Sequence, residues 1–267
     1  MRETFLRSIM LNGDTLRDMT HDQADFEIIG ETPDLIAVNK PAGLLVHPTK
    51  PGGPRTLWDA LKDLLGYEIA NGGQVSLINR LDRETSGLVL VAKNATAARR
   101  AAMAMQEGQI RKTYLALVNG IPSLDEFSVN APIIRQGEVA DTKIHLQRII
   151  HPTGAEALTH FKKRDTFKNT LGDFSLLEAR PITGRTHQIR VHIASLGHFV
   201  IGDKIYGPSE DLYLEFVKSG WTPTLSSRLH FPRHALHSAS LSIEWDGKHL
   251  EWQCPLPRDM RDFMTQT

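Results

Sequence analysis

One carboxylate in this sequence has an arginine close by on each side. Asp82 lies between Arg80 and Arg83 in the stretch "NRLDRETSGLVLVAK", which covers residues 79–93. Neighbouring cations favour the ionised form of a carboxylate, and an ionised carboxylate suits a nucleophile or a weak base better than a general acid. Taken alone, the pattern leaves two readings open. Asp82 is either a salt-bridged residue of a loop or a group that does chemistry.

Other catalytic signatures are weak or absent. A glycosidase would need a second carboxyl group across the scissile bond, and Glu84 lies only two residues from Asp82, which is too local to mark it as that partner. The sequence contains no G-x-G-x-x-G after an expected strand, no G-x-x-x-x-G-K-[ST] and no G-x-S-x-G. Dinucleotide binding, a P-loop and a serine hydrolase are therefore not indicated.

Composition is that of an ordinary soluble globular protein. The 267 residues are 40% hydrophobic and 23% charged, and this length suits one large domain or two small ones. No apolar run reaches the roughly 18 residues of a membrane-spanning helix, and the N-terminus lacks a signal peptide. We therefore expect a cytoplasmic protein without a membrane segment. The single cysteine, Cys254, cannot form an internal disulfide.

Charge is unevenly distributed although the net charge is zero. Residues 80–112 carry seven bases against three acids, and residues 180–204 carry four bases against Asp203. A neutral protein with such segments can bind a polyanion locally. Variation of this kind also occurs along chains without such a partner, so charge alone decides nothing.

The expected elements favour an α+β fold. Few of them have the strand–helix–strand spacing of a parallel crossover, so we predict a mixed, largely antiparallel β-sheet flanked by helices. Residues 1–24 are predicted to be a flexible N-terminal arm, and residues 25–267 one domain. Strands are expected at 25–29, 34–40, 76–79, 87–93, 112–120, 141–150, 156–165, 174–181 and 234–245, and helices at 56–66, 94–108, 185–197, 212–220 and 257–264.

Five segments together resemble the RluA-type pseudouridine synthases. They are "LIAVNKPAGLLVHP" (35–48), "RLDRETSGL" (80–88), "RKTYLALVNG" (111–120), "LLEARPITGRTHQIRVHIASLGHFVIGDKIYG" (176–207) and "RHALHSASL" (233–241). They follow the order and spacing of that family over about residues 25–265. The resemblance implies the pseudouridine synthase catalytic fold with a central cleft, and an isomerase that converts uridine in structured RNA (rRNA or tRNA) to pseudouridine without a cofactor or metal.

The same resemblance implies roles for individual residues. Asp82 matches the catalytic aspartate, Tyr114 the active-site tyrosine, and Arg185 the arginine that pairs with the aspartate. Arg80 matches a residue that helps to displace the flipped base. Helical spacing further predicts that Arg185, Gln188, Ile189 and His192 share one face, with polar groups directed at the site and an apolar contact from Ile189 to the RNA. Three of these residues also have a structural interpretation. Tyr114 and Ile189 could be packed core residues, and Arg80 could form a surface salt bridge that contributes roughly 0–1 kcal/mol.

The histidines do not predict a metal site. His230, His234 and His237 are close in sequence, and His187 and His192 straddle a helical turn. No His-Glu-x-x-His pattern and no carboxylate at ligand spacing accompanies them. Structural or RNA-facing histidines are the favoured interpretation.

Two departures from the family pattern are visible. Asn79 occupies the place of the family's histidine; an amide still supplies a donor and an acceptor, so we expect a structural difference with activity kept. A non-catalytic RNA-binding protein is the alternative that Asn79 keeps open. Only about 25 residues precede the first expected strand, too few for a separate N-terminal RNA-binding domain. No obligate protein partner is evident, and a monomer is expected. Lys40 and its loop are expected to shape the cleft.

Overall fold

The computed structural model describes residues 26–266, so the predicted arm over residues 1–24 lies outside the described residues. Within that range the strands are β1 (Glu27–Glu31), β2 (Leu35–Lys40), β3 (Ser76–Leu77), β4 (Ser86–Ala92), β5 (Arg111–Asn119), β6 (Glu126–Asn130), β7 (Ile133–Arg135), β8 (Arg148–Ile150), β9 (Leu158–Asn169), β10 (Gly172–Pro181), β11 (Leu236–Trp245) and β12 (Lys248–Gln253). The helices are α2 (Leu57–Leu64), α3 (Gly66–Ala70), α4 (Ala95–Gln106), α5 (Gln188–Ala194), α6 (Asp211–Ser219), α7 (Pro223–Leu229) and α8 (Arg258–Met264).

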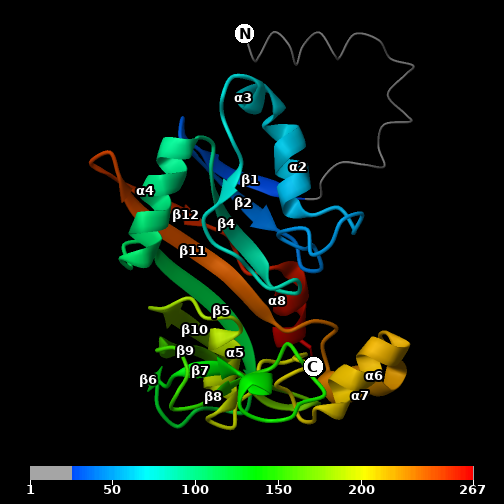
Figure 1. Cartoon of the computed structure of the whole chain (residues 1–267). Helices are drawn as coiled ribbons and strands as arrows, with labels where there is room; N and C mark the ends of the chain where they lie inside the picture. Colours follow the sequence, from blue (N-terminus) through cyan, green and yellow to red (C-terminus); the bar gives the residue numbers. More distant parts are fainter. Residues whose placement is uncertain (1–25, 267) are drawn as a thin grey trace.

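One large sheet organises this part of the chain (Figure 1). Its strand order is β1-β2-β4-β11-β5-β10-β9-β6, with β12 added to β11 and β3 added to β4. The pairing of β4 with β11 is parallel, and the other pairs of this sheet are antiparallel. β7 and β8 form a small second sheet. The predicted α+β class with a mixed, largely antiparallel sheet is confirmed.

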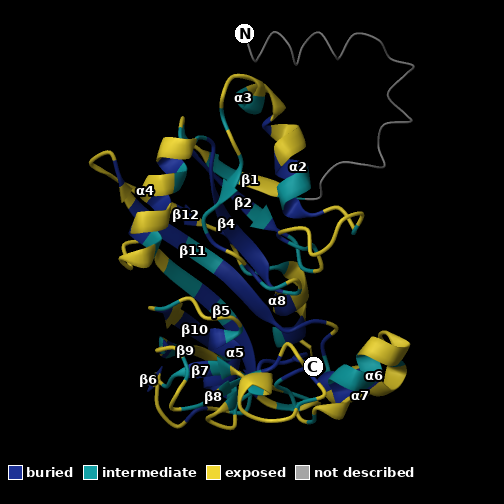
Figure 2. Cartoon of the chain, viewed as in Figure 1, coloured by how far each residue is buried: buried dark blue, intermediate teal, exposed yellow. Residues whose placement is uncertain are grey.

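β4 is buried on both faces. Its even-numbered apolar residues, Leu88 and Leu90, pack in a cluster with α4, whereas Val89 and Val91 pack in a second cluster with α2. Successive side chains of a strand point to opposite faces, so covering both faces requires the nearly unbroken apolar run that the sequence shows. Figure 2 shows the centre of the sheet buried between helices whose outer faces are exposed. The strand is therefore a rigid support for the charged loop that precedes it.

Local sequence explains where the helices beside β4 begin. Thr56 and Asp59 form a capping box at the start of α2, and the Asn94 side chain accepts a hydrogen bond from the Ala97 N–H at the start of α4. Such side chains satisfy backbone donors that have no partner within the helix. Both helices match the predicted ranges closely. None of the helices in residues 26–266 has the length and apolarity needed to cross a membrane.

The structure corrects the predicted helix at 185–197. α5 spans only Gln188–Ala194 because His187, with φ 59°, adopts the left-handed conformation that ends a regular helix. The predicted strand at 141–150 is reduced to β8. β6, β7, β12, α3 and α7 were not expected; their short length gives little periodicity to detect.

Candidate active site

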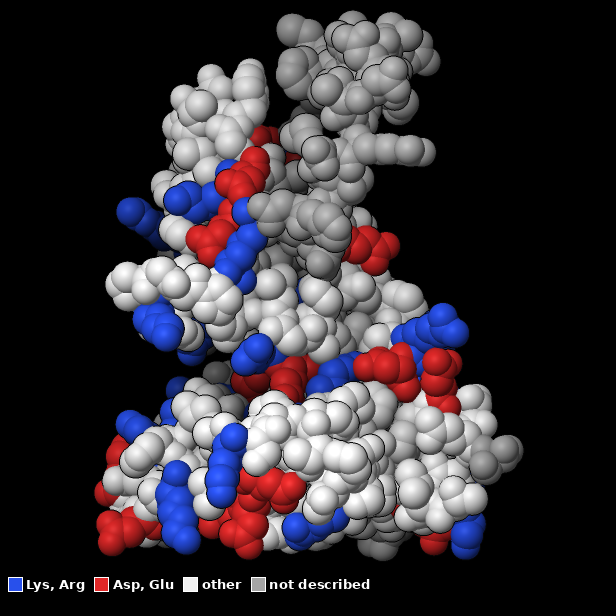
Figure 3. Space-filling model, turned by 90° about the vertical axis from the view of Figure 1, so that its right-hand side faces the viewer, with Lys and Arg blue, Asp and Glu red and all other residues white. Residues whose placement is uncertain are grey.

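The candidate site is a pocket of about 490 Å³. Its walls come from the loop between β3 and β4, from β5, and from the segment that joins β10 to α5. Figure 3 shows a hollow across the middle of the molecule, with acidic and basic side chains gathered along it. All five residues predicted for the site line this one pocket: Arg80, Asp82, Tyr114, Arg185 and Ile189.

The loop that carries Asp82 is fixed by its neighbours. The Arg83 carbonyl accepts hydrogen bonds from the Gly43 N–H at 2.8 Å and from Lys40 Nζ at 3.1 Å. Thr85 Oγ1 lies 2.7 Å from His234 Nε2. At the start of β4, a Cβ on Gly87 would lie only 2.2 Å from the Ser238 carbonyl, so only glycine allows β11 this close. The loop therefore presents Asp82 from a rigid base.

Lys40 belongs to this support and not to the pocket wall. Its Nζ donates to three carbonyls, those of Pro41 at 2.8 Å, Leu44 at 2.9 Å and Arg83 at 3.1 Å. An ammonium group has three N–H donors, so all of them are used. Lys40 thus joins the turn after β2 to the Asp82 loop, and it is residues 45–47 of its own loop that line the pocket.

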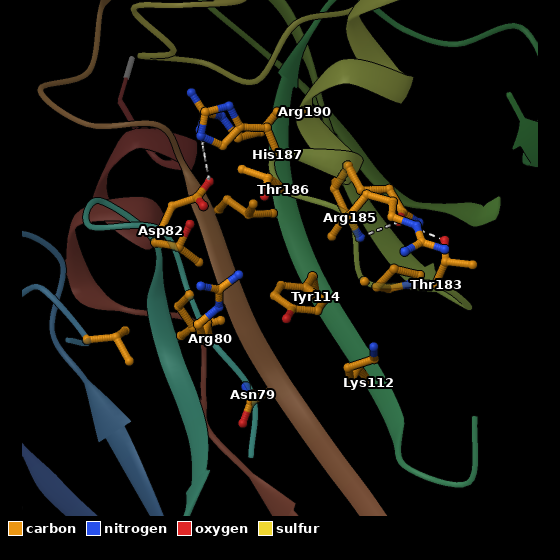
Figure 4. A pocket seen from close by; sticks show the side chains of 18 of the residues that line it. Asn79, Arg80, Asp82, Lys112, Tyr114, Thr183, Arg185, Thr186, His187 and Arg190 are labelled. Carbon is orange, nitrogen blue, oxygen red and sulfur yellow. Dashed lines mark hydrogen bonds and ion pairs between the residues drawn. The ribbon is translucent and has the colours of Figure 1, made fainter. Parts of the chain in front are cut away.

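Arg190, and not Arg185, pairs with Asp82. Arg190 Nη1 donates to Asp82 Oδ2 at 2.8 Å. The predicted pairing of Arg185 is therefore wrong, and the reason is the late start of α5. With the helix beginning at Gln188, Arg190 turns toward Asp82 while Arg185 remains in the segment before the helix (Figure 4).

Arg185 lies at the wall of the pocket with a different partner. Its Nε donates to the Glu156 carbonyl at 3.0 Å, and its backbone N–H donates to Gln188 Oε1 at 2.9 Å. Gln188 also accepts from Thr183. The predicted polar face of Arg185, Gln188 and His192 does not form, because Gln188 and His192 are buried and hydrogen-bonded within the protein.

His187 is a neutral neighbour of Asp82. Its Nε2 lies 3.9 Å from Asp82 Oδ2, and its Nδ1 lies 2.8 Å from the Tyr206 hydroxyl. Burial and the nearby Arg190 lower the pKa of His187 to about 4. The ring is therefore uncharged at neutral pH, and the cation that faces Asp82 from α5 is Arg190 alone.

Tyr114 forms the floor of the pocket from β5. Its ring is 8% exposed, and burial together with the charge of Asp82 raises the pKa of its hydroxyl to about 12. The phenol is protonated at neutral pH and can donate a hydrogen bond. The site role and the core-packing role predicted for Tyr114 and Ile189 are compatible, since both residues belong to the core cluster and also line the pocket.

Two cations in the pocket lack an anionic partner. The side chains of Arg80 and Lys112 make no hydrogen bond or ion pair with any residue in the described range 26–266. Arg80 is exposed, whereas burial lowers the pKa of Lys112. Figure 4 shows Arg80 reaching toward Tyr114 from the Asp82 loop, and Lys112 beside Tyr114 on β5. An unpaired, partly buried ammonium is costly unless a ligand compensates it.

Asn79 is a structural latch at the pocket edge. Its Nδ2 donates to the Leu88 carbonyl at 3.1 Å, and its Oδ1 accepts from the Leu90 N–H at 2.8 Å. The amide thus pairs with β4 as a neighbouring strand would. As expected for an amide in the position of the family's histidine, Asn79 uses both its donor and its acceptor.

Arg190, Asp203, His187 and Lys112 were not predicted as site residues. For two of them the sequence does contain a signal: Arg190 interrupts the apolar run "IRVHI", and Asp203 is the one acid of residues 180–204. A charge within an apolar run must be paired. His187 and Lys112 have no comparable signal.

Histidines of the C-terminal part serve the framework. His234 contacts Thr85, and His237 Nδ1 lies 2.9 Å from Ser86 Oγ. Across residues 26–266 no group of three or more His, Cys, Asp or Glu side chains is arranged to hold a metal ion. The pocket lining combines cations, one carboxylate, a phenol and apolar groups with neutral polar residues such as Thr186 and His187, and such a lining suits an anionic ligand with a planar base.

Comparison with known proteins agrees with this site. The family model described as RNA pseudouridylate synthase matches residues 34–195, more than half of the chain. A protein of Chloroflexus aurantiacus named as an uncharacterized RNA pseudouridine synthase is 40% identical over 234 residues, which cover 85% of this chain and 65% of that protein. The ribosomal large subunit pseudouridine synthase D of Zymomonas mobilis is 35% identical, covering 88% of this chain and 70% of that protein.

Solved structures share the fold. Human RNA pseudouridylate synthase domain containing 1 superposes with a TM-score of 0.67 at 26% identity, covering 88% of this chain and 84% of that chain. Human RNA pseudouridylate synthase domain containing 4 gives a TM-score of 0.69 at 24% identity, covering 88% of this chain and 90% of that chain. The predicted resemblance and fold are confirmed, and this chain belongs to the RNA pseudouridylate synthase family.

Proposed function

We propose that this protein converts uridine to pseudouridine in structured RNA, with Asp82 as the catalytic carboxylate. The observation that carries the proposal is the setting of Asp82: its carboxylate is 27% exposed, faces the pocket and is held by Arg190. The reaction breaks the bond between C1′ and N1, turns the uracil, and forms a bond between C1′ and C5. C5 loses its hydrogen as a proton and N1 gains one, so no oxidant, reductant or cofactor is required.

The other pocket residues have complementary roles in this proposal. Tyr114 stacks on the uracil and donates from its protonated hydroxyl, and Ile189 provides an apolar contact. Enzymes that act on a nucleotide within RNA must first take it out of the stack, at a cost of about a few kcal/mol. Arg80 and Lys112, which have no anionic partner among the described residues, compensate that cost by binding phosphates beside the extruded nucleotide. Arg185 contributes to RNA binding at the pocket wall and does not orient Asp82.

Large-subunit ribosomal RNA is the substrate we propose to examine first. Support comes from the relatives at 35% identity or less that are named as ribosomal large subunit pseudouridine synthases. The target is read by local RNA shape and unstacked bases, as is usual for sequence-specific RNA recognition. A tRNA target, a monomeric state and a cytoplasmic location stay predictions from the sequence. So does the placing of the whole catalytic function in residues 25–267.

The test is hydrogen release from C5. RNA transcripts carrying tritium at uridine C5 are incubated with the protein, and tritium in water is counted. We expect release from large-subunit rRNA fragments by the wild type, and none by Asp82→Asn, which keeps the shape of the side chain and its RNA affinity. Failure of the wild type to release tritium from rRNA and tRNA sets would refute the activity.

Two further readouts separate the alternatives. A non-catalytic RNA-binding protein would bind the transcripts with salt dependence and release no tritium. A nucleoside or RNA glycosidase would release free uracil, which chromatography of the products detects. Full turnover by Asp82→Asn would refute the assignment of Asp82 while leaving the activity intact.

A further inference from the structure

The buried carboxylate of Asp203 binds Arg190 on the side of the guanidinium that faces away from Asp82. Arg190 Nε donates to Asp203 Oδ2 at 2.6 Å and Nη2 donates to Asp203 Oδ1 at 2.8 Å, while Nη1 reaches Asp82 at 2.8 Å. The Asp203 side chain is fully buried, and that of Arg190 is 4% exposed. One guanidinium thus joins a carboxylate in the core to a carboxylate in the pocket.

Asp203 is itself unable to turn. Its Oδ1 also accepts the backbone N–H groups of Ile205 at 3.0 Å and Tyr206 at 3.1 Å. The residue before it, Gly202, has φ 76°, and a Cβ there would lie 1.9 Å from the Arg233 carbonyl. Because both the backbone and the carboxylate are fixed, the plane of the Arg190 guanidinium is fixed as well. Nη1 is then the nitrogen left to face Asp82.

The same segment holds the other end of the catalytic loop. Lys204 Nζ donates to Glu84 Oε1 at 2.7 Å and to the Pro232 carbonyl at 2.7 Å. Residues 203 and 204 therefore reach the loop at two points, Asp82 through Arg190 and Glu84 directly. This arrangement defines the position of Asp82 relative to the core.

Charge balance distinguishes the two carboxylates. Burial alone would raise the pKa of Asp203, but Arg190 outweighs burial and holds that pKa below its usual value. Arg190 keeps its charge for the corresponding reason. Since Asp203 already compensates the buried guanidinium, a change in the charge of Asp82 during the reaction would not leave Arg190 without a counterion in the core.

We propose that Asp203 is a positioning residue for the reaction: it orients Arg190 so that Arg190 holds Asp82 in the reactive geometry. The inference rests on the proposed function for its consequence in catalysis. Its structural part is that the orientation of Arg190 depends on Asp203 and not on Asp82, and this can be measured without an activity assay. A purely structural ion pair would stabilise the fold without affecting turnover.

The first experiment reads the Arg190 side chain by NMR. The ¹⁵Nε–¹Hε signal is assigned with Arg190→Lys, and its hydrogen exchange is measured. In Asp203→Asn, an amide N–H faces the Arg190 Nε–H, so we expect the protected signal to be lost. Asp82→Asn, which changes the partner at Nη1 only, should leave the signal protected. Loss of protection in Asp82→Asn, or its retention in Asp203→Asn, overturns the proposed dependence of Arg190 on Asp203.

The second experiment measures turnover. Misplacement of a reacting group by about 1 Å costs on the order of 10²-fold in rate, so Asp203→Asn should lower kcat by that order with KM for RNA changed less than about threefold. In an Arg190→Lys background the same substitution should cost much less, because residues that act through one another are not additive. Equal losses in both backgrounds would overturn the inference.

Glu178→Gln is the matched control. Glu178 is a buried carboxylate paired with Arg164 and Arg180, and it does not line the pocket. It should lose some stability, less than Asp203→Asn because its partners Arg164 and Arg180 are 43% and 59% exposed, and keep kcat. A comparable kcat loss in both variants would mean that any buried ion pair matters equally, which refutes a positioning role. If the wild type itself releases no tritium, the proposed function fails, while the NMR result still decides whether the orientation of Arg190 depends on Asp203.

Discussion

Asn79 offers the sharpest test of how the catalytic loop is held. Its side chain donates to the Leu88 carbonyl and accepts from the Leu90 N–H. Asn79 is 7% exposed, and both β4 residues are fully buried. Removal of the amide in Asn79→Ala therefore leaves two backbone groups of β4 without a partner and beyond the reach of water.

The magnitude follows from those two groups. An unsatisfied buried donor or acceptor costs about 1–3 kcal/mol, so Asn79→Ala should lower the free energy of unfolding by about 2–6 kcal/mol. Asn79→Asp keeps the acceptor but replaces the donor by a second acceptor facing the Leu88 carbonyl, and it should cost at least as much. A neutral imidazole has one donor and one acceptor. Asn79→His, which restores the residue of the family pattern, should therefore remain within about 1 kcal/mol of the wild type.

Urea unfolding followed by circular dichroism measures these free energies, and tritium release measures turnover in the same variants. Asn39→Ala is the control, because Asn39 makes one solvent-exposed hydrogen bond, to Glu27; surface changes of this kind fall within about 0.5 kcal/mol. A loss below about 0.5 kcal/mol in Asn79→Ala would refute the latch. A stable but inactive Asn79→His would show that Asn79 acts on the substrate instead.

Three further outcomes are expected. Tyr114→Phe keeps the ring but loses the protonated hydroxyl, so kcat should fall by about 10²-fold or more while RNA affinity, measured by filter binding, stays the same; unchanged kcat would limit Tyr114 to stacking. Lys40→Met removes a donor from three carbonyls, of which only that of Arg83 keeps another, the Gly43 N–H, and should lower the urea midpoint strongly; a midpoint equal to that of the wild type would contradict the supporting role of Lys40. Burial lowers the pKa of His237 to about 4, so as the pH falls the unfolded chain protonates this imidazole before the folded protein does. The stability it contributes is complete above about pH 6.5 and is lost as the pH falls toward 4, by up to about 3 kcal/mol. His237→Gln should flatten the fall of the urea midpoint between pH 7 and 5, and an unchanged slope would contradict this reasoning.

The support for the site was predictable because it depends on local pattern. The apolar run of β4 is continuous since both faces of the strand are buried. Asp82 precedes one expected strand and Tyr114 lies within another, so their approach to one pocket needed only the sheet order. The arginine partner was not predictable in the same way. Periodicity placed the helix start near Arg185, whereas the left-handed backbone at His187 moves it to Gln188, and a shift of three residues exchanges one arginine for another.

Asp203 shows a second limit of reading a sequence. The sign of its charge is visible, but its partner lies 13 residues away across a turn. Only the fold shows that its carboxylate points inward at Arg190 and not outward to solvent. Pairing between buried charges is a property of the assembled core, so residue type and spacing alone could not separate Asp203 from an exposed acid.

Pairing also explains how a protein of zero net charge can bind RNA. Of the seven bases in residues 80–112, Lys93 and Arg100 are neutralised by carboxylates of the protein, Glu31 and Asp246. The other five form no ion pair with a carboxylate among residues 26–266, and of these five Arg80 and Lys112 line the pocket. Two cations without a carboxylate partner therefore face the site, whatever the total charge of the chain.

The two pocket cations predict a defined contribution to the salt dependence of RNA binding. Each phosphate neutralised on a single strand contributes about −0.7 to the slope of log K against log salt concentration, so Arg80 and Lys112 alone give about −1.4. Lys112→Met should reduce the magnitude of the slope by about 0.7, and Lys248→Met, which alters an exposed lysine of β12, should leave it unchanged. Binding curves at several salt concentrations measure all three slopes. If Lys112→Met keeps the slope of the wild type, Lys112 does not meet a phosphate, and its unpaired charge must serve the uracil ring instead.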